Sequence, residues 1–365
     1  MEKQKISPSQ LLAMIVLFEF GTALVVPIGL QAERGTWLSV LLALPGGLLL
    51  FWVYDTLSRH YPELILSGYI RKLLGRYLGV PLCVLYAAFF IYLASRVLRD
   101  GGDLLVTSSY DQTPILMIQA IMMIAVVYVL RKGVEVFFRL GQIYIFIMIS
   151  LGLIGNMSIL FSGIVDIRNL LPLFEDWPSL IAAAYPDILL FPFGELVVFT
   201  TVLPRLERSV RTRRTGLVAV AVSGVALSLS HGMQIAVLGE DVYARATFPL
   251  FEAISLVNIA EFWQRLDALV VLTLIIGVFF KVSMFMYAAM AVAADLFRER
   301  DPSRLTLPIG SVVLLMSIFM AWSFPEHLRE GETTIHTHLV FFCLLVPLLL
   351  LGVHAARARR NTVGK

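Results

Sequence analysis

Long apolar stretches alternate with short polar ones along the whole chain. Ten apolar stretches can be drawn, at approximately 10–30, 36–54, 80–98, 114–130, 138–161, 180–203, 216–238, 268–292, 305–323 and 339–355. Most of them are long enough to cross the apolar part of a bilayer as an α-helix, which rises about 1.5 Å per residue. The pattern therefore predicts an all-α integral membrane protein with ten transmembrane helices.

The composition supports this class and excludes others. Of the 365 residues, 58% are apolar and 15% are charged, and the mean hydropathy is +0.83. A water-soluble fold cannot bury that much apolar surface, and disordered, collagen-like, coiled-coil and disulfide-scaffold chains do not have this composition. Cys83 and Cys343 lie in apolar stretches and form no metal-binding pattern. We expect neither a metal nor a cofactor.

The distribution of Lys and Arg predicts the orientation. If the N-terminus is cytoplasmic, 21 of the 29 Lys and Arg residues fall in inner segments and six in outer ones. Because positive residues gather on the cytoplasmic side, both termini are predicted to be cytoplasmic. The basic cluster at 205–214 lacks interleaved aromatic residues, so we interpret it as an inner-face anchor and not as a nucleic-acid site. Residues 1–5 are followed by no small-residue cleavage site, so the first stretch is expected to be a retained helix.

The connections between the stretches contain no linker and no soluble domain, so residues 1–365 are predicted to form a single transmembrane domain. Two outer connections, 162–180 and 239–267, contain amphipathic pieces such as Phe251–Leu256, and we expect short helices there. On the inner side, residues 67–76 have the pattern of an interfacial helix, with basic residues beside apolar ones.

Ten helices divide into five and five, which makes the second half enter the membrane inverted. We expect a 5+5 inverted repeat, with residues 1–165 as the first half and 166–365 as the second. Helices one and six then correspond, and each contains an interruption with a glycine and a glutamate near the middle of the membrane: Gly21 with Glu19, and Gly194 with Glu195. Interrupted helices at corresponding positions of two inverted halves indicate a transporter binding site.

The chemistry of an interrupted helix suggests the ligand. Pro192 lacks an N–H and opens the helical hydrogen-bond ladder, while Gly21 and Gly194 let a ligand approach the backbone. Freed N–H groups attract a carboxylate and freed C=O groups attract an ammonium. An amino-acid-sized zwitterion fits both, and choline-like or inosine-like molecules are alternatives. Phe193 is predicted to be a gate or floor beside Gly21, Thr22 and Gly194.

Two glutamates lie within the predicted helices, where a charge is costly and usually functional. Glu195 follows the interruption of helix six. It is either a partner of a ligand ammonium, a proton-binding group or a gate, or a structural carboxylate bonded to freed backbone N–H groups. Glu19, one turn before the other interruption, is either functional or a buried strut between helices.

Several short motifs, in this order, resemble the endospore germination permeases, the B subunits of nutrient germinant receptors. The matching stretches are Ile6–Leu11, Gly21–Pro27, Tyr69–Gly75, Asn169–Pro172, Phe191–Glu195, Asn258–Phe262 and Gln264–Val270. The resemblance implies a transporter fold of the amino acid–polyamine–organocation type in the spore inner membrane. It also implies a receptor that senses a nutrient, often an amino acid, and assembles with an A subunit and a lipoprotein C subunit.

By analogy with that fold, helix eight faces helix one and helps to form a sodium site in sodium-coupled relatives. The ammonium of Lys281 is expected either to replace that ion or to pair with Glu19 or Glu195. Ser283 and Tyr287 follow on the same helix, and the spacing allows only one of them to point inward with Lys281.

Helix three lines the pocket opposite helix eight in this fold, and it supplies one face with Phe89, Tyr92, Leu93 and Arg96. We expect Phe89 and Leu93 at the pocket, with ordinary helix packing as the alternative. Arg96 is predicted to bind Asp103, Asp187, another outer acid or a ligand carboxylate. His336 and His338 are expected in an exposed outer loop, because two histidines without a third ligand do not make a zinc site.

Three classes of function were compared. The first is a nutrient-sensing receptor subunit, and the second is a stand-alone, proton-coupled amino-acid permease. The third, an intramembrane enzyme, lacks support because the chain contains no metal motif, nucleophile elbow or phosphate-binding loop. The sequence favours the first and leaves the second open, since fold does not decide between them.

Overall fold

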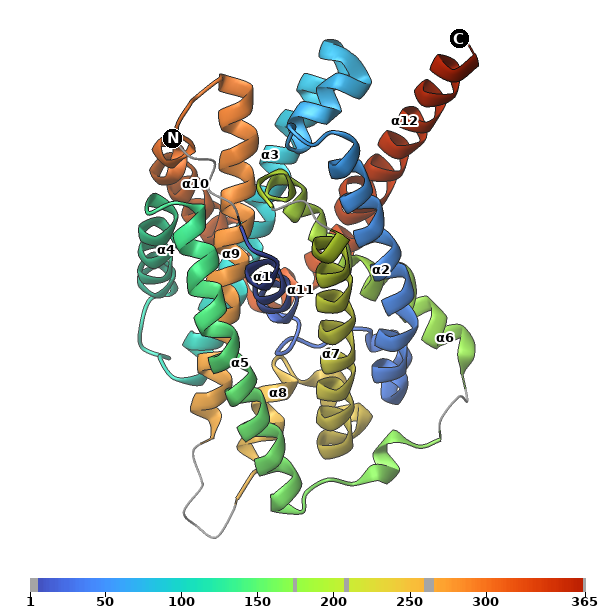
Figure 1. The fold of residues 1–365 in the computed structure, drawn as a ribbon. Coiled ribbons are helices and arrows are strands. Elements are labelled where there is room, and N and C mark those ends of the chain that lie inside the picture. The colour runs from blue at the N-terminus through green and yellow to red at the C-terminus, as the bar shows by residue number, and fades with distance from the viewer. Residues whose placement is uncertain (1–5, 173–175, 207–209, 259–265, 364–365) are drawn as a thin grey trace.

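The computed structural model describes residues 6–172, 176–206, 210–258 and 266–363, and the regular elements in this part of the chain are all helical (Figure 1). The α-helices are α1 (Pro8–Phe20), α2 (Thr36–His60), α3 (Leu66–Ser108), α4 (Ile115–Arg131), α5 (Val134–Ser162), α6 (Trp177–Ala182), α7 (Val210–Arg245), α8 (Pro249–Ser255), α9 (Asp267–Phe297), α10 (Thr306–Phe319), α11 (Phe324–Thr334) and α12 (Val346–Val363). Shorter 3₁₀ and π segments are η1 (Leu30–Gly35), η2 (Ile167–Leu170), η3 (Ala183–Ile188), η4 (Phe193–Thr201), η5 (Leu203–Arg205), η6 (Pro302–Leu305) and η7 (Ile335–Leu345).

Eight helical segments of the described chain are long and apolar enough to cross a membrane. Two further apolar helices, α1 and α4, are shorter, with 13 and 17 residues. Each of the ten predicted stretches falls on one of these segments, and an all-helical membrane protein is thereby confirmed. The predicted boundary between repeats, 165/166, falls in the connection between α5 and η2, and the inverted repeat itself stays a prediction.

The core of the bundle is built around α9 and α1. Helix α9 packs most extensively against α3, and its middle turns are buried on every side, as expected for a helix that is apolar all round. Helix α1 lies in the middle of the view in Figure 1 and packs against α5, α7 and α9. It starts with a capping box, in which the Ser7 hydroxyl accepts from Gln10 N and the Gln10 side chain accepts from Ser7 N.

The short helices predicted between the spans are largely present. The piece at 67–76, predicted for the inner side, is helical up to Gly75, which has φ of 77° and separates it from the rest of α3. The connections predicted for the outer side contain η2 and α8, and the latter includes most of Phe251–Leu256. Asp176 caps α6, and hydrogen bonds from Ser179 hold the pKa of Asp176 below its usual range. Residues 207–209 of the basic cluster and 259–265 of the late motifs lie outside the described residues.

Candidate functional site

The interruption in helix one is an open helix end. Helix α1 stops at Phe20, and Gly21 N donates to the Leu17 carbonyl as the last α-type bond of the helix. Among the described residues, no hydrogen-bond donor reaches the carbonyls of Phe18 and Glu19. The chain then leaves the helix and resumes regular structure only at η1. Two free carbonyls at the negative end of a helix dipole make this a place that favours positive charge.

Polar side chains of α7 hold the opened stretch in place. Gln234 Nε2 donates to the Leu24 carbonyl at 3.2 Å. His231 Nε2 lies 2.9 Å from the Ala23 carbonyl, which can only accept, so this nitrogen carries the proton. His231 Nδ1 then accepts from the Tyr243 hydroxyl at 2.9 Å, and that hydroxyl accepts from Ile28 N at 3.3 Å. The stretch after Gly21 is thus a defined structure and not a loose linker.

The interruption in the sixth predicted stretch is of a different kind. This stretch is built from α6, η3 and η4 and is called segment six below. The α-type pattern gives way to a turn at residues 191–192, and η4 continues as a 3₁₀ helix through Gly194 and Glu195. The Gly194 carbonyl is covered: the Tyr54 hydroxyl lies 3.1 Å from it and donates its single proton to the Cys343 carbonyl at 2.5 Å. The expectation that Gly194 offers open backbone to a ligand is wrong, because α2 and η7 pack directly against it.

Phe193 is also placed differently from the prediction. Its ring is completely buried and lies against Gly47 of α2 and Gly224 of α7, where an added Cβ would be 2.7 Å and 3.1 Å from the nearest ring atom. Phe193 is absent from the cavity lining among the described residues, so its role as a gate or floor stays a prediction that the lining does not support. The neighbouring aromatic residue, Phe191, lines the cavity instead.

A buried ion pair connects the two interruptions. Lys281 Nζ lies 2.6 Å from Glu195 Oε2, and the two side chains are 0% and 3% exposed. The ammonium also lies 4.6 Å from the centre of the Phe191 ring and 5.3 Å from that of Phe18. The aliphatic part of Lys281 passes beside Gly21, where an added Cβ would be 2.5 Å from its Cδ. Of the predicted alternatives, the structure contains the pair with Glu195.

Glu19 differs from Glu195 in having no partner. Its side chain is fully buried, and neither carboxylate oxygen has a hydrogen-bond partner among the described residues. A strut between helices requires such a partner, so that alternative is not supported. A buried carboxylate without a donor is a costly group that structural needs alone do not explain.

A cavity of about 170 Å³ lies beside the open end of α1. Its walls come from α3, segment six, α11, η7 and the opened stretch that follows α1 (21–29). The lining residues used below are Thr22, Pro27, Leu93, Arg96, Asp100, Phe191, Glu195, Glu332 and Ile335. Pockets for drug-sized ligands measure roughly 300–1,000 Å³, so this one suits a smaller molecule. The buried Thr22 hydroxyl at its wall has no hydrogen-bond partner among the described residues.

The cavity has a cation and carboxylates on its walls. Arg96 Nη2 donates to the His327 carbonyl at 2.8 Å, and Nη1 lies 3.4 Å from the Tyr92 hydroxyl. These contacts fix the guanidinium and leave donors over, since arginine has five N–H groups. Asp103, an expected partner of Arg96, is paired with Arg99 instead. Asp100, which the sequence analysis did not select, also lines the cavity and lies 2.9 Å from His327 Nε2.

Of the other predicted site residues, Thr22, Leu93, Arg96 and Glu195 line this cavity, and Gly21 lies behind it against Lys281. Phe89 does not line it, because its ring stacks on Phe342 at a centroid distance of 4.4 Å. Ser283 and Tyr287 are buried outside it, each with a hydroxyl that has no hydrogen-bond partner among the described residues.

A second cavity of about 630 Å³ adjoins the first and shares Pro27, Leu30, Phe191, Glu332 and Ile335 with it. Asp187 lies in its wall, where Asp187 Oδ2 accepts from Gln31 at 3.1 Å and Oδ1 lies 3.4 Å from His336 Nε2. The predicted loop around His336 and His338 is wrong, since both belong to η7. Among the described residues there is no group of three potential metal ligands.

An interrupted helix, a buried ion pair and a small charged cavity inside an apolar bundle define a helical integral membrane protein with an internal polar site. The chain belongs to the spore germination protein family, whose model matches residues 5–325. It is 38% identical to spore germination protein KB of Bacillus subtilis (strain 168), over 100% of this chain and 98% of that one. It is also similar to spore germination protein YndE of the same organism, with 23% identity over 88% of each chain. The resemblance noted from the sequence motifs is thereby confirmed.

Proposed function

We propose that this chain is the membrane subunit of a germinant receptor, and that it binds a small nutrient in the cavity beside Thr22, Arg96 and Glu195. The proposal rests above all on that cavity, which sits at the open end of α1 and has a cation and carboxylates among its lining residues. It takes the receptor role from the family and from the relative named as a spore germination protein. The protein acts here as a binding protein and not as an enzyme.

An amino acid is the ligand class that this arrangement favours. Its carboxylate can accept from the remaining N–H donors of Arg96, with the paired geometry that guanidinium groups give. Its ammonium can lie toward Glu195 and Asp100, near the free carbonyls at the end of α1. The volume of about 170 Å³ restricts the side chain to a small one. Phe191 separates this cavity from the adjoining larger one and is suited to close over a ligand.

The proposed setting is the spore inner membrane, with both termini cytoplasmic and with an A subunit and a lipoprotein C subunit as partners. We further propose a 5+5 inverted-repeat transporter fold with ten spans. The support is the resemblance to germination permeases together with the asymmetric distribution of Lys and Arg. Co-purification of the tagged chain from spore membranes, followed by identification of the bound proteins, tests the partners. Flanking genes for A and C subunits would also favour the receptor.

The binding site is tested by titrating the purified chain with a panel of amino acids and measuring the heat of binding. Arg96→Gln is expected to weaken binding of the best ligand at least about tenfold, since hydrogen bonds to charged groups contribute about 1.5–3 kcal/mol. Arg329→Gln is the matched control, because Arg329 is exposed on α11 and lies outside the cavity. Equal binding by the wild type and Arg96→Gln would contradict the site.

A stand-alone, proton-coupled amino-acid permease is the second candidate. Fully buried Glu19, with no partner for its carboxylate among the described residues, favours it as a proton-binding group. Uptake of labelled amino acid into proteoliposomes that contain only this chain separates the two functions. Accumulation driven by an imposed proton gradient would favour the permease, while binding without accumulation favours the receptor subunit.

A further inference from the structure

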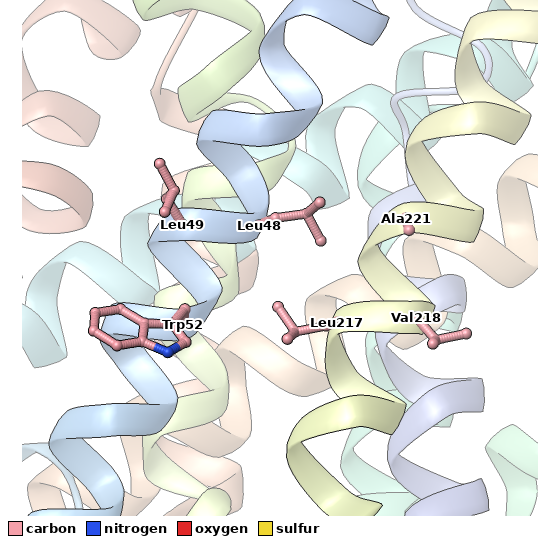
Figure 2. Close-up of a pocket in the computed structure, with 6 residues that line it drawn as sticks. All are labelled: Leu48, Leu49, Trp52, Leu217, Val218 and Ala221. Atoms are coloured by element: carbon pink, nitrogen blue, oxygen red, sulfur yellow. The ribbon is translucent and has the colours of Figure 1, made fainter.

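An apolar groove runs between α2 and α7 on the outside of the bundle. It has a volume of about 560 Å³ and is lined by Leu48, Leu49, Trp52, Leu217, Val218 and Ala221. Figure 2 shows these side chains on two neighbouring helices, with Leu48 and Leu217 both pointing into the gap. Leu49 and Val218 are more than half exposed, so the groove opens toward the surroundings of the bundle.

Basic side chains close one end of this groove. The helical spacing places Asp55 and Thr56 one turn beyond Trp52, and Arg214 one turn before Leu217 and Val218. Arg213 pairs with Asp55, donates to the Thr56 hydroxyl at 3.0 Å, and lies 5.8 Å from the Trp52 ring.

Positive charge is in excess at this end. Asp55 is the acceptor for both Arg59 and Arg213. Arg214 is exposed, and no carboxylate of the described chain lies within ion-pair distance of it. This end of the groove therefore favours an anion, whereas the apolar side chains along the rest of the groove favour a hydrocarbon chain.

The groove has the dimensions of a lipid site within one leaflet. Leu217 and Ala221 follow Arg213 by four and eight residues, so the apolar lining extends about 6–12 Å from the level of the guanidinium groups. Both helices belong to segments that are long and apolar enough to cross a membrane, and His60 and Thr212 are at the ends of those segments. Trp52 lies near this end, as aromatic residues do at the boundary between headgroups and hydrocarbon.

We propose that the α2–α7 groove binds one anionic phospholipid, with an acyl chain along Leu48, Trp52 and Ala221 and its phosphate at Arg214 and Arg213. Basic pockets between membrane helices bind anionic headgroups in this way. The site is distinct from the nutrient cavity. Leu48 of the groove follows Gly47, which packs against Phe193, so the α2 turn that lines the groove also contacts segment six.

The test is fluorescence quenching at Trp52. The full-length chain is reconstituted in phosphatidylcholine vesicles, and brominated phosphatidylglycerol or brominated phosphatidylcholine is titrated in. The signal of Trp52 is obtained by subtracting a Trp52→Phe variant, because the chain has five tryptophans. We expect phosphatidylglycerol to quench Trp52 at a several-fold lower mole fraction than phosphatidylcholine.

Two variants separate the headgroup from the chain. Arg214→Gln is expected to weaken the preference for phosphatidylglycerol about fivefold, since one basic residue near a membrane surface contributes about 1 kcal/mol. Arg245→Gln, at the other end of α7, is the matched control and should change nothing. Ala221→Phe fills the groove and should reduce quenching by both lipids. Far-ultraviolet circular dichroism verifies that each variant is folded.

Four results would overturn the proposal. Equal quenching by the two lipids in the wild type would show a surface covered by bulk lipid. An unchanged preference in Arg214→Gln would remove the headgroup site. If soluble glycerol phosphate reversed the quenching of Trp52 by brominated phosphatidylglycerol, the basic end would be assigned to a free phosphate. Protection of Trp52 from both brominated lipids in the complex purified with its natural partners would assign the groove to a protein.

Discussion

The two interruptions of this chain have the same sequence signature and different structures. At Gly21 the α-helix ends, two carbonyls have no donor among the described residues, and a cavity lies alongside. At Gly194 the chain tightens into a 3₁₀ helix, and the Tyr54 hydroxyl covers the Gly194 carbonyl while it donates to Cys343. The difference lies in the surroundings and not in the glycines.

Each neighbourhood explains its interruption. Beside Gly194, α2 supplies the Tyr54 side chain and a glycine surface and η7 supplies Cys343, so the backbone is covered and Phe193 is held between α2 and α7. Beside Gly21, α7 binds the carbonyls from Ala23 onward but not those before it. A glycine and a glutamate in an apolar helix therefore indicate an interruption, while neighbouring helices decide whether it becomes an open site.

The largest expected effect concerns the ion pair that joins the two regions. Lys281→Ala leaves Glu195 buried without its partner and should lower the free energy of unfolding by about 3–5 kcal/mol. The double variant Lys281→Ala with Glu195→Gln should recover much of this loss. Thermal unfolding in detergent and membrane protein level are the measurements. Equal recovery by Glu19→Gln as the second change would show that the pair is assigned to the wrong glutamate.

Phe193 and Phe191 provide a matched pair of adjacent aromatics. Phe193→Ala should destabilise the protein by roughly 3 kcal/mol, because it leaves a cavity between α2 and α7. Phe191→Ala should alter ligand affinity with a smaller loss of stability, because this ring lines the two cavities. Unfolding temperature and ligand titration are measured for both. A Phe193→Ala variant that remains stable and changes the affinity for the ligand would contradict this comparison.

Adding a methyl group at Gly21 and at Gly194 tests the contrast between the two interruptions further. The Cβ of Gly21→Ala would lie 2.8 Å from the Phe18 carbonyl oxygen and 2.5 Å from Lys281 Cδ, so we expect a loss of about 1–3 kcal/mol. The nearest atom to a Cβ at Gly194 is 3.1 Å away and belongs to the Leu190 side chain. Gly194→Ala should therefore cost less than about 1 kcal/mol. Chemical denaturation of both variants gives the order, and a reversed order would refute it.

The smallest expected effect is none at all. The Lys281 side chain passes beside the open end of α1 and pairs with Glu195, so we expect that no sodium ion is needed there. Replacing sodium with potassium should leave ligand binding or nutrient response unchanged. Isothermal titration in matched sodium and potassium buffers is the measurement. Strict sodium dependence of the wild type would exclude this role for Lys281.

The sequence determined the class of the protein and the approximate place of the site. Apolar stretches of bilayer length can only be satisfied as helices, because backbone polar groups find no water in hydrocarbon. Thr22, Leu93, Arg96 and Glu195 were selected by charge, by helical spacing or by nearness to an interruption, and all four line the cavity. Glycine and proline in an apolar helix also marked where the α-type pattern fails.

Only the tertiary structure decided which side chains face one another. Phe193 was selected because it adjoins Gly194, yet Gly47 and Gly224 on distant segments pack against it. Asp100 continues the helical face of Leu93 and Arg96, but only the structure shows that it meets His327 of α11. The pairing of Lys281 with Glu195, and not with Glu19, likewise depends on how α9 meets segment six. Burial and helix periodicity are local properties that the sequence contains, whereas the partner of each buried charge is set by the packing of helices far apart in the chain.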